Sequence, residues 1–303
     1  MENLLKIRET IANVLEINSA EITNIDLVVG GMTNNSYKVT INNQNYIARI
    51  PGNGTAEMIN REYEKANCVI ANELELDAKI IYINADNGVK IAEFIEGAQT
   101  LTVAMTKRED VMVKVTKLLR TLHQSKVLFQ NDFDVFREIE KYELLAQSLN
   151  VCLFEDYNQT KLRVMRLEKI LDHLERERVA CHNDTASFNI LKDKNERLYL
   201  IDWEYSGNND PMWDLAAHAL ESEFNKDEEH LLLQKYFKMS DVTEKQKIKL
   251  LLFQICQDFL WSVWTCIREA KGSDFGTYGI DRYLRSKQKL DELEVKLKIE
   301  KVV

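Results

Sequence analysis

The sequence predicts an α+β protein built from two lobes, and three observations support this class. Over residues 1–96, short apolar runs rich in β-branched residues alternate with turn sequences such as ADNG at 85–88, which is typical of strands. From residue 97 onward, apolar residues recur every three or four positions over long stretches, which indicates helices. The chain has 303 residues, 45% of them hydrophobic, so it can bury a sizeable core. We therefore expect a β-rich lobe over 1–96 and a mainly helical lobe over 97–303.

The elements of the first lobe follow from hydrophobic periodicity and turn residues. Leu4, Ile7 and Ile11 belong to an apolar stripe that predicts a helix near the N-terminus, and the polar residues at 42–45 predict the turn of a hairpin. In chain order, we expect a helix over 2–17, a strand over 21–31, a hairpin over 36–50, a helix over 57–74 and strands over 78–84 and 89–95.

The second lobe is predicted to be helical, with one interruption at residues 181–205. We expect helices over 107–124, 133–149 and 159–177, and again from about residue 211 to the end. Within the interruption, NILK and LYLID flank the turn DKNER and can pair as a hairpin. That hairpin would bring Asn189 close to Asp202.

The composition argues against several classes of protein. A formal net charge of −9 argues against a nucleic-acid partner, and five scattered cysteines without a CxxC pair indicate a reducing compartment. The N-terminal segment lacks the apolar core of a signal peptide, and no apolar run approaches the about 18 residues of a membrane span. We expect a cytoplasmic protein without membrane insertion; the sequence does not indicate an oligomeric state.

The stretch CHNDTASFNILKDKNERLYLIDWEY at 181–205 carries the chemistry. Asp184 and Asn189 are five positions apart, and Asp202 follows an apolar strand. Phosphoryl transfer from ATP needs one carboxylate to orient and deprotonate the acceptor hydroxyl, and an amide and a second carboxylate to hold Mg²⁺. Each residue alone is as often structural as functional, but the joint spacing matches the catalytic loop and metal-binding aspartate of protein kinases. His182 is then expected to order the loop.

The upstream half contains the other parts that a kinase-like lobe needs. The loop GGMTNNSY at 30–37 can bring backbone N–H groups to phosphates, and its candidate contacts are Gly31, Thr33 and Asn34. Arg49 lies on the second hairpin strand, where kinases carry a phosphate-contacting lysine, and arginine can make this contact bidentately.

A carboxylate on the next helix should hold this arginine. Adenine, in turn, needs backbone N–H and C=O groups to bind. Glu62 and Glu64 both lie early in the helix; either can pair with Arg49, and we favour Glu64. The stretch IAEFIEG at 91–97 is similar to the hinge that contacts adenine in kinases, so we expect Glu93 and Ile95 to contribute to nucleotide binding.

The order GGMTNNSY, ARI, HNDTASFN, LIDWEY and NDPMWDLA resembles the choline/ethanolamine kinase family, which belongs with the aminoglycoside-phosphotransferase-like kinases. Within it, the chain is most similar to the bacterial choline kinases of the phosphorylcholine-decoration (lic) pathway. The resemblance implies a two-lobed, protein-kinase-like fold that converts ATP and choline into ADP and phosphocholine with Mg²⁺. It implies that Asp184 is the catalytic base and that Asn189 and Asp202 are the metal ligands. Arg49 stands where many relatives have lysine.

Choline is a quaternary ammonium without an N–H group, so its site needs aromatic faces and nearby negative charge. Trp261 and Trp264 are three apart on a predicted helix and share a face, although such a pair is more often core packing. The family places residues corresponding to Tyr205, Glu221 and the tryptophan pair around choline. Two further tryptophans, Trp203 and Trp213, are expected to be structural.

Two other functions remain open at this stage. A kinase of the same fold acting on ethanolamine, an aminoglycoside or thiamine would share the catalytic groups, but the aromatic pair favours choline. A non-catalytic choline-binding protein is disfavoured because Asp184, Asn189 and Asp202 are all present.

Overall fold

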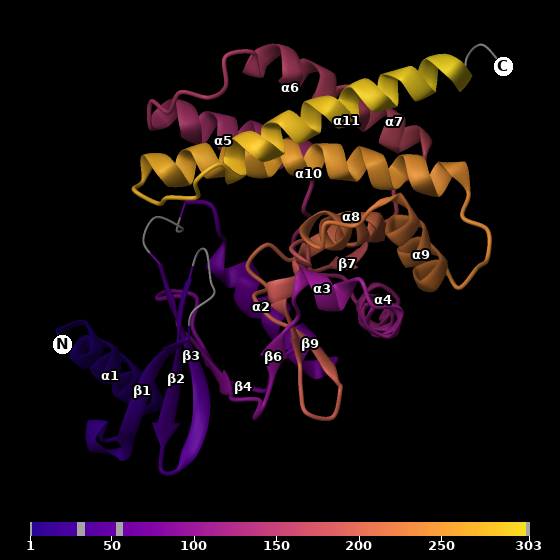
Figure 1. Ribbon diagram of the computed structural model, residues 1–303. Helices are drawn as coiled ribbons and strands as arrows, with labels where there is room; N and C mark the ends of the chain where they lie inside the picture. The colour runs from indigo at the N-terminus through magenta and orange to yellow at the C-terminus, as the bar shows by residue number, and fades with distance from the viewer. Residues whose placement is uncertain (1, 29–33, 53–56, 301–303) are drawn as a thin grey trace. The chain divides into compact units, whose positions relative to one another are not determined.

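A computed structural model describes residues 2–28, 34–52 and 57–300 (Figure 1). The chain forms two compact units: Met1–Thr102 with Ser187–Ser206, and Val103–Ala186 with Gly207–Val303. The sequence places the boundary at residue 96 and the whole of 187–206 in the helical lobe. The difference arises because the hairpin within 187–206 pairs with a strand at residues 99–100 of the first unit.

The first unit is built on a five-stranded antiparallel sheet with the order β1-β2-β3-β5-β4. Its elements are α1 (Glu2–Leu15), β1 (Ile22–Val28), β2 (Asn34–Ile41), β3 (Gln44–Pro51), α2 (Arg61–Glu73), β4 (Ile80–Ile83) and β5 (Lys90–Glu93). A short 3₁₀ turn, Ser19–Glu21, joins α1 to β1. The predicted helices, hairpin and strands of this lobe are therefore present.

The β2–β3 hairpin has a tighter turn than the sequence suggests. Ile41 pairs with Gln44, so only Asn42 and Asn43 form the loop. Their φ angles of +49° and +63° are left-handed, a conformation that asparagine tolerates and that two-residue hairpin turns require. Ile7 and Ile11 of α1 pack against the sheet in one buried cluster.

A second, three-stranded sheet completes the first unit. It consists of β6 (Gln99–Thr100), β8 (Ile190–Lys192) and β9 (Leu198–Leu200) in the order β6-β8-β9, and the 3₁₀ turn Ser187–Asn189 leads into β8. The predicted NILK–LYLID hairpin is confirmed, because β8 and β9 pair antiparallel with Ile190 opposite Leu200.

The second unit is mainly helical. Its elements are α3 (Val103–Thr106), α4 (Glu109–His123), α5 (Val135–Ser148), α6 (Tyr157–Met165), α7 (Leu167–His173), β7 (Val179–Cys181), β10 (Gly207–Asn209), α8 (Pro211–Glu221), α9 (Lys226–Phe237), α10 (Glu244–Ala270) and α11 (Tyr278–Glu300). The single helix predicted over 159–177 is instead two helices that meet at Arg166. No glycine or proline marks that break in the sequence.

Helix α10 forms the centre of this unit and packs against α5, α8 and α11 (Figure 1). By length and composition α10 could cross a membrane. Its sequence contains no long unbroken apolar run, because Gln254, Gln257 and Asp258 interrupt it. In the structure, 94% of its most apolar window is buried, as in the central helix of a folded core. Gly279 of α11 allows close approach, since a Cβ atom there would lie 2.8 Å from the Thr265 side chain.

Candidate active site

The predicted site residues divide between the two units. His182, Asp184, Glu221, Trp261 and Trp264 lie in the second unit. The first unit contains the remaining predicted residues that the structure describes, which are Asn34, Arg49, Glu64, Glu93, Ile95, Asn189, Asp202 and Tyr205. Gly31 and Thr33 lie outside the described residues.

The loop that carries Asp184 follows β7 and is held by Asp214 of α8. The backbone N–H groups of His182 and Asn183 donate to Asp214 Oδ2 and Oδ1, at 2.9 and 2.7 Å. The Thr185 hydroxyl donates to the backbone carbonyl of Asp214 at 2.6 Å. Asp214 is fully buried, and its side chain and backbone carbonyl together hold the loop on both sides of the predicted catalytic base.

His182 lies inside this loop. Its Nδ1 accepts a hydrogen bond from the backbone N–H of Asp184 at 3.3 Å, and its side chain is buried. This contact is the kind expected of a loop-ordering residue. The two tryptophans expected to be structural are also buried: Trp203 donates to the Leu200 carbonyl, and Trp213 donates to the Asn183 carbonyl, each at 3.1 Å.

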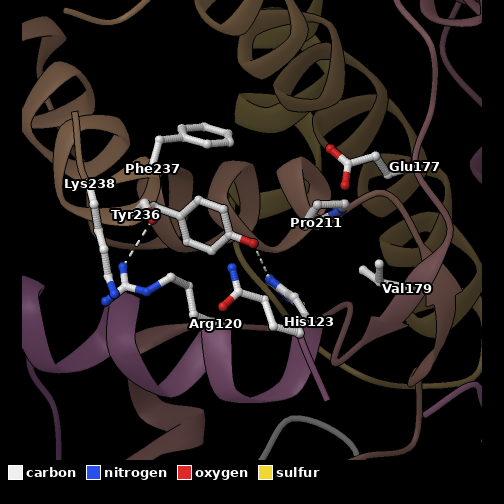
Figure 2. A pocket seen from close by; sticks show the side chains of 9 residues that line it. Arg120, His123, Glu177, Val179, Pro211, Tyr236, Phe237 and Lys238 are labelled. Atoms are coloured by element: carbon white, nitrogen blue, oxygen red, sulfur yellow. Dashed lines mark hydrogen bonds between the residues drawn. The ribbon is translucent and has the colours of Figure 1, made fainter. Parts of the chain in front are cut away.

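Asp214 also connects the loop to a small pocket between α4 and α9 (Figure 2). His123 Nε2 lies 2.9 Å from Asp214 Oδ2, and its Nδ1 lies 2.7 Å from the hydroxyl of Tyr236. Burial raises the pKa of Tyr236, and negative charge near it adds to the effect. Arg120, at the pocket wall, donates to the carbonyls of Lys235 and Tyr236 at 2.6 and 3.0 Å.

A second buried histidine contacts the loop from α8. His218 Nδ1 lies 3.1 Å from the carbonyl of Thr185, which can only accept, so this nitrogen carries the proton of the neutral ring. Nε2 is buried and has no hydrogen-bond partner among the described residues. Burial therefore lowers the pKa of His218 to about 4.

In the first unit, the β8–β9 hairpin brings the two predicted metal ligands together. Asn189 ends the 3₁₀ turn before β8, and its carbonyl accepts a hydrogen bond from Ile201 N at 2.9 Å. Asp202 is the next residue and has a left-handed φ of +67°. The backbone therefore brings Asn189 to the residue that precedes Asp202, as the sequence predicts.

Arg49 of β3 pairs with two carboxylates. Its Nη1 contacts Glu64 Oε1 and lies 3.0 Å from Asp202 Oδ1. Burial on its own would lower the pKa of Arg49, but the charges of Glu64 and Asp202 outweigh it and raise the pKa. Glu64 is buried and Glu62 is exposed, so the favoured partner, Glu64, is confirmed.

Three further residues belong to this cluster. Arg61 Nη1 lies 2.5 Å from Glu64 Oε2 and 3.3 Å from Glu204 Oε2. Asn34 donates to Glu204 Oε2 at 2.8 Å and to Asp202 Oδ1 at 3.4 Å. Arg61 and Glu204 are not among the residues predicted from the sequence, although the spacing of two between Asp202 and Glu204 is a usable signal.

The cluster is suited to a divalent cation. Carboxylate oxygens of Glu64, Asp202 and Glu204 lie within 4.8 Å of one another, and oxygen is the ligand that Mg²⁺ prefers. Burial, together with the charge of Asp202, raises the pKa of Glu204 to about 7. Burial disfavours the ionised form of this carboxyl, and a cation bound beside it would favour that form.

The predicted hinge, residues 91–97, begins within β5 and continues past its end. The Glu93 N–H donates to the Lys79 carbonyl at 2.8 Å, and its side chain pairs with Lys79 at 2.9 Å. The Ile95 carbonyl accepts from Ala98 N at 3.1 Å. A role in adenine binding stays a prediction. Tyr205, also in this unit, is buried.

In the second unit, the tryptophan pair lies on α10 and is buried. The rings of Trp261 and Trp264 meet edge to face, with centroids 6.2 Å apart. Phe275 packs against Trp264 at 5.2 Å, and the Arg268 guanidinium lies 5.8 Å from the same ring. Both packing and ligand binding use such a pair, so the choline role stays a prediction.

Glu221 and Tyr278 add charge and another aromatic ring to this unit. Glu221 ends α8 and pairs with Arg282 of α11. Tyr278, which is not among the residues predicted from the sequence, begins α11, and the Arg282 guanidinium lies 4.6 Å from its ring centroid. Burial and then the charge of Asp184 raise the pKa of Tyr278, which associates this ring with the predicted catalytic base.

Comparison with known proteins identifies similar chains. The sequence profile of the choline/ethanolamine kinase family matches residues 25–287. Protein LicA of Haemophilus influenzae is 30% identical over 272 residues, covering 88% of this chain and 79% of that protein. The crystal structure of choline kinase LicA from Streptococcus pneumoniae is 38% identical, with a TM-score of 0.84, and the match covers 96% of this chain and 100% of that one.

A structure of LicA in complex with AMP is similarly close, at 37% identity and a TM-score of 0.82, over 95% of this chain and 97% of that one. These structures have the α+β, kinase-like fold that the sequence predicts, so the predicted fold class is confirmed.

Proposed function

The chain belongs to the choline/ethanolamine kinase family, and we propose that it transfers the γ-phosphoryl group of ATP to the hydroxyl of choline, giving phosphocholine and ADP. The observation that supports the choice of choline is the group of aromatic rings in the second unit, which also contains Asp184. The rings of Trp261 and Trp264 form an edge-to-face pair. The negative charge of Asp184 adds to the effect of burial in raising the pKa of Tyr278.

Asp184 is the proposed base. Its carboxylate orients the choline hydroxyl and accepts its proton as the oxygen attacks the γ-phosphorus, and ADP leaves. Such a base is effective only if it is held in place before the reaction. Two buried groups hold its loop here, because Asp214 accepts from two backbone N–H groups and His218 contacts the Thr185 carbonyl.

Asn189 and Asp202 are the proposed ligands of Mg²⁺, which when bound would neutralise charge on the phosphate oxygens. Arg49 is the proposed phosphate contact, and it also joins Asp202 to Glu64 and so holds the carboxylate of Asp202 in one orientation. Arginine suits this position because its planar guanidinium can bind two carboxylates at once. We propose that Asn34, Glu93 and Ile95 contribute to nucleotide binding.

The acceptor head group determines the rest of the proposal. A trimethylammonium group has no N–H to donate, so aromatic rings attract it better than hydrogen-bond acceptors do. Each ring contributes on the order of 1 kcal/mol or more where the cation is desolvated. We propose that Trp261, Trp264 and Tyr205 provide these faces and that Glu221 supplies negative charge. Ethanolamine, which carries three N–H donors, would gain less from the same rings.

An ADP-release assay across choline, ethanolamine, thiamine and an aminoglycoside tests the proposal. Choline should have the highest kcat/KM, and a clear preference for ethanolamine would show that the aromatic argument is wrong. Asp184→Ala should lower kcat by at least about a thousandfold, as loss of a central catalytic group does in other enzymes. Asp184→Asn is the matched control for shape, because it keeps the side-chain volume but cannot accept the proton. Near-normal turnover in both variants would refute the assigned base.

A further inference from the structure

Four charged side chains form a partly buried network in the second unit. Arg282 of α11 contacts Glu221 at the end of α8, and its Nη1 lies 3.0 Å from Asp258 Oδ1 on α10. Arg285, three residues further along α11, donates to both carboxylate oxygens of Asp258 at 2.7 and 2.5 Å. Arg282 is therefore the residue that joins carboxylates from two different helices.

Burial separates the roles of these four residues. Side-chain exposure is 3% for Arg282, 0% for Asp258, 18% for Glu221 and 38% for Arg285. Asp258 is satisfied twice, once by each arginine. Glu221 is partly exposed, and Arg282 is its ion-pair partner among the described residues. A buried arginine between two carboxylates restricts orientation, because its planar fork fits only one arrangement of both.

The same guanidinium contacts an aromatic ring. Tyr278 and Arg282 are four apart on α11, and the Arg282 guanidinium carbon lies 4.6 Å from the Tyr278 ring centroid. The charge of Asp184 acts on both side chains. Arg282 therefore contacts both a carboxylate and an aromatic ring, in the unit that contains the proposed base.

We propose that Arg282 is a positioning residue for the acceptor: it orients the Glu221 carboxylate and the Tyr278 ring toward the cationic head group. This inference rests on the proposed function. Because Arg282 pairs with Glu221, Glu221 contributes to binding through the orientation of its oxygens as well as through its negative charge.

Loss of the arginine has a specific expected effect. In Arg282→Gln, Glu221 loses its partner and can turn toward water, since it ends its helix and is already partly exposed. The KM for choline should rise at least about tenfold, while the KM for ATP should stay within about twofold. Arg282→Lys should give an intermediate KM, because an ammonium group cannot bind two carboxylates in the same fixed geometry.

The matched control is Arg285→Gln. It removes a cation from the same helix and from the same aspartate, but it leaves the pairing with Glu221 intact. Its choline KM should stay within about threefold of the wild type. Thermal unfolding of each variant shows whether the fold is kept, and Arg282→Lys carries the test if Arg282→Gln does not fold.

A double-mutant cycle tests whether Arg282 acts through Glu221. Glu221→Gln and Arg282→Gln are measured alone and together, by initial rates and by calorimetric titration of choline without ATP. If Arg282 acts through Glu221, the double variant binds choline no more weakly than the weaker single variant. Additive losses, or equal rises in the KM for choline and for ATP, would overturn the inference. Wild-type turnover of choline is measured first and tests the proposed function separately.

Discussion

Replacement of Asp214 by asparagine is a stringent test of how the catalytic loop is held. The aspartate offers two oxygens to three donors: Oδ2 faces His182 N and His123 Nε2, both at 2.9 Å, and Oδ1 faces Asn183 N at 2.7 Å. Asparagine has one oxygen and one amide group. If the oxygen takes the Oδ2 position, the amide faces the Asn183 N–H, and a donor meets a donor.

The cost follows from these contacts. One buried N–H without an acceptor costs about 1 to 3 kcal/mol, and two bonds to a charged oxygen become bonds to a neutral one, at about 1 kcal/mol each. Asp214→Asn should therefore lower the free energy of unfolding by about 3 to 5 kcal/mol. The loop should also relax, and a displacement of about 1 Å at the base can reduce turnover about a hundredfold.

Urea unfolding followed by tryptophan fluorescence measures the first effect, and ADP release measures the second. The control is Asp227→Asn, since Asp227 is exposed on α9 of the same unit and should change stability by less than about 0.5 kcal/mol. A loss below about 1 kcal/mol in Asp214→Asn, with unchanged kcat, would refute the assignment of Asp214 as the residue that holds the loop.

Three other predictions concern the remaining parts of the site. Arg49→Met removes the cation that Glu64 and Asp202 share and leaves Arg61 as the partner of Glu64, so urea unfolding should show a loss of about 2 to 5 kcal/mol; an unchanged midpoint would contradict this. The pKa of His218 is lowered to about 4 in the folded protein, so as pH falls the unfolded chain binds a proton first. The free energy of unfolding should therefore decrease by up to about 3 kcal/mol between about pH 6.5 and 4. The His218→Asn variant should lack that slope, and a retained slope would assign it to another group. Trp264→Ala should raise the KM for choline far more than the KM for ATP; equal changes would indicate a packing role.

Much of the site can be predicted from local sequence because its parts lie on short, regular segments. The turn DKNER between two apolar runs predicts the β8–β9 hairpin, and the hairpin in turn brings Asn189 to the residue before Asp202. The position of Arg49 on β3 follows from the hairpin register in the same way.

Other parts depend on burial that periodicity cannot supply. Glu62 and Glu64 are two apart on a helix, so they lie about 200° apart around its axis and cannot both face Arg49. The sequence alone does not say which side is covered, and the structure buries Glu64. The prediction of one helix over 159–177 was wrong for a similar reason, because no local residue type marks the break at Arg166.

The sequence by itself determined the class of fold and the chemical groups, because strand and helix periodicities and the spacing of Asp184, Asn189 and Asp202 are local properties. Only the tertiary structure decided what holds these groups. Asp214 lies 32 positions from His182, and Arg282 lies 24 positions from Asp258. Such pairs form because burial leaves a charge or an N–H group no water to bind, and the identity of its partner is set by which helices pack together.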